Sequence, residues 1–86
     1  MKLTDMQSKL YHSHTIRNRE EINLSEYCHC ICCTKSYPSP IVINFIKDGD
    51  GETALCPYCG IDSIIGDSCG LEINQEILTE LNKRWF

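Results

Sequence analysis

Cysteines are the residues of this chain that are best able to do chemistry, and its 86 residues contain seven of them. Four form two pairs of identical spacing, Cys30 with Cys33 and Cys56 with Cys59. Two intervening residues allow both sulfurs of a pair to turn toward one ion, or to join in a disulfide. The pairs therefore predict either a metal site or a thiol–disulfide centre.

A metal site would use both pairs at once. The chain reads C-x2-C-x22-C-x2-C, and this gap slightly exceeds the usual gap of about 15–20 residues. Four thiolates at about 2.3 Å from one ion complete a tetrahedral shell, which is typical of structural rather than catalytic zinc. We therefore predict one structural Zn²⁺ bound by Cys30, Cys33, Cys56 and Cys59.

The second pair also lies in the sequence Cys56-Pro57-Tyr58-Cys59, which resembles the active site of glutaredoxins. That resemblance implies a thiol–disulfide oxidoreductase, in which the N-terminus of a long following helix lowers the pKa of the nucleophilic thiol. Gly60 follows at once, and only 27 residues remain after Cys59. These are too few for the missing strands and helices, so redox catalysis through Cys56 and Cys59 stays a minor alternative.

Three cysteines lie outside these pairs. Cys28 and Cys32 could replace members of the first pair, but the new pairs would have only one intervening residue. Cys69 is distant from both pairs in sequence and is interpreted as a small, buried apolar side chain. His29 could also be a ligand, although four cysteines already complete the shell. The roles of the three extra cysteines stay open.

The composition of the chain indicates where in the cell the protein would lie and which partners it would bind. Acidic residues outnumber basic ones 12 to 8 and the net charge is −4, which disfavours binding of nucleic acid through a basic face. No apolar run approaches the length of a membrane span, and residues 1–6 lack the apolar part of a signal peptide. We therefore expect a cytoplasmic protein with no membrane partner, where reduced thiols favour metal binding over disulfides.

Residues 3–20 are expected to begin as a helix. The stretch Thr4-Asp5-Met6-Gln7 has a capping-box pattern, in which the first and last side chains bond each other's backbone amides. Apolar residues recur at helical spacing and are predicted to form one face. They are Leu3, Met6 and Leu10, with Tyr11 beside them. The pattern fades after this point, so the end of the helix is undefined, and His12 and His14 are expected on the surface.

The segment between the cysteine pairs predicts a β-hairpin. Residues 41–46 favour a strand, residues 47–51 contain the glycines of a turn, and residues 52–55 form the returning strand. This hairpin would have one cysteine pair at each base. The turn superficially resembles a calcium loop that starts at Asp48, but its twelfth position is Cys59 instead of the required glutamate.

The clearest helix is predicted over residues 73–86. Asn74 is a suitable N-cap, and the cations of the last turn suit the helix dipole. An apolar stripe recurs along one face. It consists of Ile73, Ile77, Leu81 and Trp85, with Leu78 beside them. Trp85 and Phe86 are predicted to form part of a partner-binding surface or of a seam that closes the domain.

Together these segments predict one domain over residues 1–86, of the small α+β class. Its centre, residues 25–70, is expected to form a zinc-ribbon-like β-hairpin with two cysteine knuckles. The N-terminal segment 3–20 and the amphipathic helix 73–86 flank this centre. A chain this short buries a limited core, which favours a metal ion as an additional staple.

The segment from Thr53 to Asp67, which contains C-P-Y-C-G-I-D-S-I-I-G, resembles a group of small bacterial and phage cytoplasmic proteins of zinc-ribbon-like type. The resemblance extends to His29-Cys30-x-x-Cys33 and to residues 83–86, and it covers roughly half of the chain. It implies a zinc-binding fold and no particular activity. Thr34 stands where such knuckles usually have glycine, which makes the register of the first pair less certain than that of the second.

We expect a non-catalytic protein-interaction or regulatory module built on structural zinc, with another protein as its partner. The metal shell is closed, and no set of nucleophile, base and phosphate-binding loop stands out. A zinc ribbon that binds nucleic acid is the first alternative, although the lysines and arginines do not cluster in the sequence. A glutaredoxin-like oxidoreductase is the second alternative. The oligomeric state is not defined by the sequence.

Overall fold

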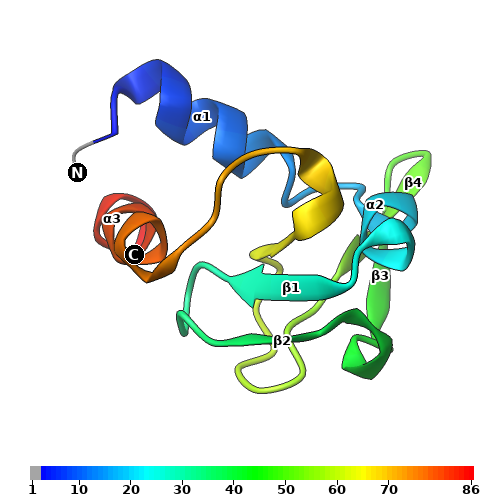
Figure 1. Ribbon diagram of the computed structural model, residues 1–86. Helices are drawn as coiled ribbons and strands as arrows, with labels where there is room; N and C mark the ends of the chain where they lie inside the picture. Colours follow the sequence, from blue (N-terminus) through cyan, green and yellow to red (C-terminus); the bar gives the residue numbers. More distant parts are fainter. Residues whose placement is uncertain (1–2) are drawn as a thin grey trace.

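The computed structural model describes residues 3–86. The predicted 1–86 domain and the segment 1–6 that was considered for a signal peptide both include residues 1 and 2, which lie outside the described residues. The described residues form an α+β fold with antiparallel strands, and Figure 1 shows α1 and α3 together on one side of it. The elements in chain order are α1 (Asp5–Ser13), α2 (Arg19–Leu24), β1 (Tyr27–Cys30), β2 (Ser36–Pro38), the 3₁₀ helix η1 (Ser39–Ile41), β3 (Phe45–Asp48), β4 (Gly51–Ala54), β5 (Ile64–Gly66), the 3₁₀ helix η2 (Asp67–Cys69) and α3 (Gln75–Trp85).

The N-terminal segment begins as predicted but is not a single helix. The Gln7 N–H donates to the Thr4 hydroxyl at 3.1 Å, and the Thr4 N–H donates to the Gln7 side chain at 2.9 Å, which confirms the capping box. Helix α1 ends at Ser13. The chain then turns through Arg17, whose φ is +46°, and enters α2 at Arg19. This second helix was not predicted.

The buried face of α1 differs from the predicted one. Leu3 and Tyr11 are buried as expected, but Met6 is 83% exposed and Leu10 is also exposed. Tyr11 belongs to an apolar core, and its hydroxyl donates to the Glu72 carbonyl at 2.6 Å. A helix can present either of two neighbouring stripes, and here the tertiary contacts select the stripe that contains Tyr11.

Strand β1 is the centre of a three-stranded sheet, with β2 on one side and β5 on the other. Side chains alternate between the faces of a strand, so Ile64 and Ile65 of β5 point to opposite faces. Cys30 lies opposite Ile64 in the β1–β5 pairing, and His29 lies opposite Ile65. None of these three strands was predicted, because their apolar runs are short and they lack the glycine-rich turn that indicated the β3–β4 hairpin.

Two apolar cores lie on the two faces of this sheet. The first is rich in cysteine and consists of Ile22, Cys28, Cys30, Tyr37, Val42, Ala54, Cys56 and Ile64. The second joins the terminal helices to the sheet and consists of Leu3, Tyr11, Ile31, Ile65, Ile77, Leu78 and Leu81. Ile64 and Ile65 of β5 supply opposite cores, and so do Cys30 at the end of β1 and Ile31 directly after it, so the β1–β5 pairing sets the positions of both cores.

The predicted hairpin is present as β3 and β4, with shifted bounds. Strand β3 begins at Phe45, later than predicted, because Ile41 ends the 3₁₀ helix η1 and residues 42–44 form no strand. Gly49 supplies a φ of +62° in the turn. Arg17 lies across this hairpin, and a Cβ added to Gly51 would lie 3.1 Å from its Cβ and Cγ atoms. Glycine at position 51 therefore permits the close approach of Arg17.

Helix α3 confirms the predicted C-terminal helix. The Ile77 N–H donates to Asn74 Oδ1 at 2.9 Å, so Asn74 is the N-cap. Ile77, Leu78 and Leu81 are buried in the second core. Trp85 was predicted to extend this stripe, but its side chain is only partly covered, because it lies at the last turn of the helix. Helices therefore flank the strands at both ends of the described chain, as expected.

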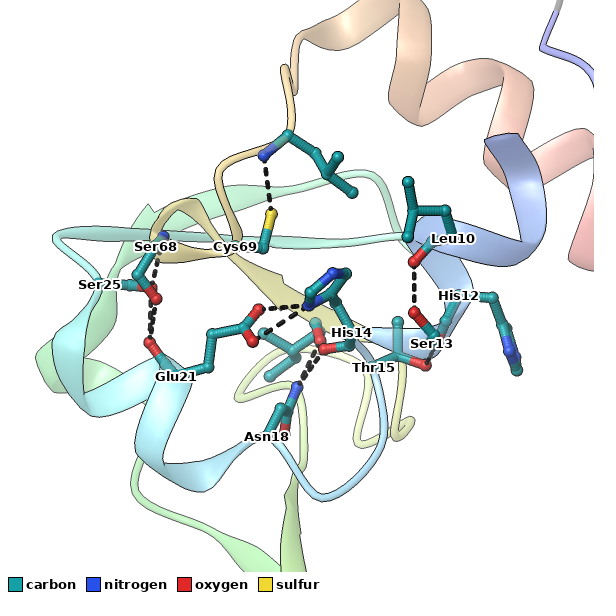
Figure 2. Close-up of polar contacts among 12 residues, drawn as sticks. Leu10, His12, Ser13, His14, Thr15, Asn18, Glu21, Ser25, Ser68 and Cys69 are labelled. Carbon is teal, nitrogen blue, oxygen red and sulfur yellow. Dashed lines mark hydrogen bonds and ion pairs between the residues drawn. The ribbon is translucent and has the colours of Figure 1, made fainter. Parts of the chain in front are cut away.

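A buried asparagine joins α1 to both sheets. Asn18 Nδ2 donates to the His14 carbonyl at 3.0 Å and to the Ile64 carbonyl at 2.8 Å. Asn18 Oδ1 accepts the Ala54 N–H at 3.0 Å. The side chain thus replaces backbone pairing at the point where α1, β4 and β5 meet. Figure 2 shows this residue next to the end of α1.

Replacing Asn18 with alanine should lower the free energy of unfolding by about 3 kcal/mol, because the Ala54 N–H and the Ile64 carbonyl would be buried without a partner. Urea denaturation would measure the loss. Asn23 is exposed in α2, so Asn23→Ala is a matched control that should change stability by less than about 0.5 kcal/mol. Equal losses in the two variants would contradict the role assigned to Asn18.

Candidate metal centre

Four sulfur atoms converge in the first core. The Sγ atoms of Cys30, Cys33, Cys56 and Cys59 all lie within 4.8 Å of one another. Cys30 Sγ is 3.6 Å from Cys59 Sγ, and Cys33 Sγ is 3.7 Å from Cys56 Sγ. A tetrahedral shell with metal–sulfur bonds of about 2.3 Å places its sulfurs about 3.8 Å apart. The four predicted ligands are therefore brought together at a spacing that suits one metal ion.

The same distances distinguish this cluster from a set of disulfides. All cysteines in residues 3–86 are free thiols. Disulfide sulfurs are bonded at about 2.05 Å, far less than the 3.6 Å between Cys30 and Cys59. The contacts of 3.6 Å and 3.7 Å join the two pairs to each other. The Cys56/Cys59 pair is therefore half of a larger cluster and does not stand alone as a dithiol.

Strand pairing explains why pairs so distant in sequence meet. Cys30 ends β1, so the first pair lies in the connection from β1 to β2. Cys56 follows β4, and the second pair lies in the connection to β5. Because β5 pairs with β1, the two connections lie side by side. The prediction that one hairpin carries a pair at each base is therefore wrong for the first pair, which has a hairpin of its own.

The two cysteine turns have the same construction. In the first turn, the Cys30 N–H donates to the Lys35 carbonyl at 2.9 Å. In the second turn, the Cys56 N–H donates to the Ile61 carbonyl at 3.0 Å. Each bond closes its turn five residues after the first cysteine. Two equivalent turns facing each other can therefore present four sulfurs to one point.

Thr34 departs from the usual glycine but adopts the conformation of glycine. Its φ is +59°, close to the φ of +76° at Gly60, the equivalent position of the second turn. This left-handed conformation costs a residue with a side chain about 1–2 kcal/mol. The unusual residue therefore strains the first turn without shifting it, and Cys30 and Cys33 remain the pair that joins the cluster.

The first cysteine of each pair is buried and lies beside a hydroxyl group. Tyr37 Oη donates to Cys56 Sγ at 3.1 Å, and Ser63 Oγ lies 3.4 Å from Cys30 Sγ. Both hydroxyl-bearing residues are themselves buried. Ser63 Oγ also accepts the Cys32 N–H at 3.3 Å, which leaves its own proton for the sulfur. The two least accessible sulfurs thus each have a hydrogen-bond donor.

The surroundings shift the pKa values of these thiols in opposite directions. Burial raises the pKa of Cys30 and of Cys33, against the effect of backbone hydrogen bonds in their turn. Burial also acts to raise the pKa of Cys56, but hydrogen bonds from the Tyr37 hydroxyl and from the backbone of its own turn outweigh it and lower the pKa to about 6. These hydrogen bonds therefore favour the thiolate form of Cys56, which is the form that binds metals.

Tyr37 and Ser63 were not identified from the sequence. Tyr37 reaches the cluster because β2 pairs with β1, where it lies opposite Cys28. Ser63 lies just before β5, and its carbonyl accepts the Ile31 N–H of the first turn at 3.0 Å. A strand prediction for the short apolar run after Ser63 is the one sequence signal that would have placed this residue near the first turn.

The remaining cysteine of the first core and its neighbours do not join the cluster. Cys28 is fully buried, and burial followed by the charge of Asp67 raises its pKa to about 12. Cys32 lies in the first turn, but the group of four sulfurs does not include it. His29 faces away from Cys30 across β1, and its Nδ1 lies 2.6 Å from Ser36 Oγ. His29 is therefore not placed to be a ligand.

Figure 2 shows a separate polar group around Cys69 and His14. His14 Nδ1 lies 3.1 Å from one Glu21 carboxylate oxygen and 3.0 Å from the other. Cys69 is partly exposed, not fully buried as predicted, and its Sγ accepts the Leu71 N–H at 3.4 Å. Burial raises the pKa of Cys69, the opposite of what activates a nucleophile. The contact between His14 and Glu21 has a structural role, because it joins the C-cap of α1 to α2.

The two C-terminal aromatic residues have different surroundings. Trp85 is 39% exposed and stacks on His12 of α1, with the ring centroids 4.3 Å apart and an interplanar angle of 27°. Phe86 is 59% exposed. Both line a small hollow of about 100 Å³ together with Asp62 and Ser63. Trp85 thus contributes to the contact between α1 and α3, whereas most of Phe86 faces solvent.

Replacing Thr34 with glycine should stabilise the protein by about 1 kcal/mol, because the left-handed conformation is unstrained for glycine. Thr34→Ala is the matched control, since it removes the hydroxyl and the β-branch but keeps the strained Cβ. Thermal and urea denaturation of both variants would measure the effect. A gain in stability from alanine equal to that from glycine would contradict the assignment of strain to this backbone conformation.

Comparisons with known proteins give no family for this chain. No protein-family model matches it, and no match was found among curated proteins or solved structures. Within residues 3–86, no helix combines the length and the apolar character needed to cross a membrane. Function is therefore inferred from the geometry of the cysteine cluster and its surroundings.

Proposed function

We propose that this protein is a zinc-ribbon-like module in which one structural Zn²⁺ is bound by Cys30, Cys33, Cys56 and Cys59. The observation that carries the proposal is the single group of four sulfurs with tetrahedral spacing. An all-sulfur tetrahedral set favours zinc or iron, and four protein ligands leave zinc with no open position for a substrate. The metal would then support the fold and take no part in a reaction.

The first cysteine turn connects the proposed zinc site to α3. Asn82 Nδ2 donates to the Ile31 carbonyl at 3.1 Å and to the Cys32 carbonyl at 2.7 Å. The Ile31 side chain is buried in the second core. Structural zinc contributes apparent binding free energies on the order of 10–16 kcal/mol in small domains. Zinc at Cys30 and Cys33 would therefore hold the surface on which α3 docks.

We further propose that the module acts by binding another protein. Support comes from the exposed Phe86 and the half-covered Trp85, which lie together at the end of α3. Aromatic side chains contribute strongly to the binding energy of protein interfaces. The net charge of −4 suits a protein partner better than a polyanion.

Nucleic-acid binding has weaker support. Arg17, Arg19 and Lys47 line one hollow beside the β3–β4 turn. However, Arg19 lies 2.7 Å from the Glu52 carboxylate, and Arg17 lies 3.9 Å from that of Asp48. Cations that are paired in this way offer less attraction to phosphates than an unopposed basic face does.

Thiol–disulfide exchange through Cys56 and Cys59 also has weaker support. The second turn passes through Gly60, with a φ of +76°, and continues to the short strand β5. The helix N-terminus that activates a redox cysteine therefore does not follow this pair. Cys56 and Cys59 also lie close enough to Cys30 and Cys33 for one ion to bind all four, and a thiolate bound to zinc would not be free to attack a disulfide.

Replacing Cys59 with serine should remove most of the bound zinc and unfold the region around both turns, because three thiolates leave the shell incomplete. Cys69→Ser is the matched control, since Cys69 lies outside the cluster, and it should keep wild-type zinc. Elemental analysis of protein purified under reducing conditions would measure zinc per chain. Wild type is expected to contain about one equivalent.

Two results would contradict the proposal of structural zinc. Wild-type protein with less than about half an equivalent of zinc after reconstitution would remove its basis. Glutathione-dependent disulfide reduction by zinc-loaded protein, abolished in Cys56→Ser while zinc stays bound, would instead favour the oxidoreductase.

Deleting Phe86 should weaken recovery of the partner protein while leaving stability and zinc content close to wild type, because most of this side chain faces solvent. Deleting both Trp85 and Phe86 should also cost about 1–2 kcal/mol of stability, because the stacking of Trp85 on His12 is lost. Affinity capture with both variants and thermal denaturation would measure these effects. A loss of stability from the single deletion as large as from the double one would make Phe86 a core residue instead.

A further inference from the structure

Hydroxyl groups are placed at the two buried sulfurs of the cysteine cluster. Tyr37 donates to Cys56 Sγ at 3.1 Å, and Ser63 lies 3.4 Å from Cys30 Sγ. These two cysteines are buried, whereas Cys33 and Cys59 are partly exposed and can receive hydrogen bonds from water. The protein therefore supplies donors at the positions that solvent reaches least.

A buried site of four thiolates has an excess of negative charge, which hydrogen bonds to the sulfurs can stabilise. Four thiolates exceed the charge of a divalent cation by two, so the complex stays anionic in a medium of low dielectric constant. A hydrogen bond to a charged acceptor is stronger than one between neutral groups. Donation from a hydroxyl withdraws charge from sulfur and also fixes its direction toward the metal.

Both hydroxyls are held in place by the fold. The Tyr37 ring lies within the first core and packs against the Tyr58 ring, with centroids 5.4 Å apart. Ser63 Oγ accepts the Cys32 N–H at 3.3 Å, and the Ser63 carbonyl accepts the Ile31 N–H at 3.0 Å. The hydroxyl positions are thus set by strand pairing and by the first turn, and not by contact with the ion.

We propose that Tyr37 and Ser63 are positioning residues of the metal centre, whose hydroxyls donate to the thiolates of Cys56 and Cys30 and thereby set metal affinity and the electron density on sulfur. This inference rests on the proposed metal-binding function. Neither residue binds the ion, and each has a role that goes beyond packing. On the side of the second cysteine turn, Tyr37 is the principal determinant of metal affinity and of the electron density on sulfur.

The test compares Tyr37→Phe with Tyr58→Phe, because the two tyrosines belong to one aromatic contact but only Tyr37 donates to Cys56 Sγ through its hydroxyl. Tyr58 donates to the same sulfur through its backbone N–H at 3.4 Å, and Tyr58→Phe keeps that bond. Competition with a chromophoric chelator would measure Zn²⁺ affinity, and spectra of the Co²⁺-substituted proteins would report the sulfur-to-metal charge-transfer band. Tyr37→Phe should lower Zn²⁺ affinity by about 10-fold to 100-fold. Its Co²⁺ band should also move to lower energy, because sulfur loses a donor. Tyr58→Phe should leave both readouts at wild-type values.

The possible results separate this inference from the proposed function. If wild type binds neither Zn²⁺ nor Co²⁺, the metal-binding function itself fails. If wild type binds both and Tyr37→Phe matches it in affinity and spectrum, the function stands and the inference fails. A loss of affinity in Tyr37→Phe without a band shift also overturns the inference, because it would indicate a packing role only.

Ser63→Ala provides the second arm and keeps the proposal testable if Tyr37→Phe does not fold. Cys30 should lose its hydroxyl donor, so the Co²⁺ band should shift in the same direction and Zn²⁺ affinity should fall. Ser68→Ala is a suitable control, because its hydroxyl bonds the Glu21 carbonyl and Ser25, away from the cluster. A Ser63→Ala spectrum identical to that of wild type would overturn the role assigned to the hydroxyl at Cys30.

Discussion

Four thiol groups whose sulfurs approach to 3.6 Å cannot all ionise inside a protein unless a cation neutralises them. The fold places such a group between two cysteine turns that are built alike. Each turn is closed by a hydrogen bond from its first cysteine, and each includes a left-handed residue, Thr34 or Gly60. The short strands around the turns have few ladder bonds of their own. A metal ion at this position would therefore supply the cross-link that the small core lacks.

The first cysteine turn also couples the cluster to the second core. Ile31 points into that core, while the neighbouring Cys30 points into the first. Asn82 of α3 binds two carbonyls of the same turn. Contacts therefore run from the cysteine cluster through Asn82 to α3, and from Trp85 of α3 to His12 of α1. This physical path joins the proposed zinc site to the proposed partner surface at the end of α3.

Local chemistry accounts for the parts of the protein that were predicted well. The capping box at Thr4 needs only a contact three residues away, and the Asn74 cap with its apolar stripe is equally local. Glycines between two strand-like segments indicated the β3–β4 hairpin for the same reason. The repeated cysteine spacing predicted the four residues that meet, because two pairs of equal spacing form equivalent turns that can present four sulfurs to one point.

Local sequence patterns were thus enough to predict which four cysteines come together and which segments form the terminal helix and the β3–β4 hairpin. The position of β1 as a central strand follows only from its pairing with β2 and β5, because the sequence Tyr27–Cys30 contains no β-branched residue that would indicate a strand. The tertiary structure also decided that Tyr37 and Ser63 reach the buried sulfurs and that α1 buries Tyr11 while Met6 stays exposed. These features depend on contacts between residues far apart in the chain, and such contacts cannot be predicted from a local sequence pattern.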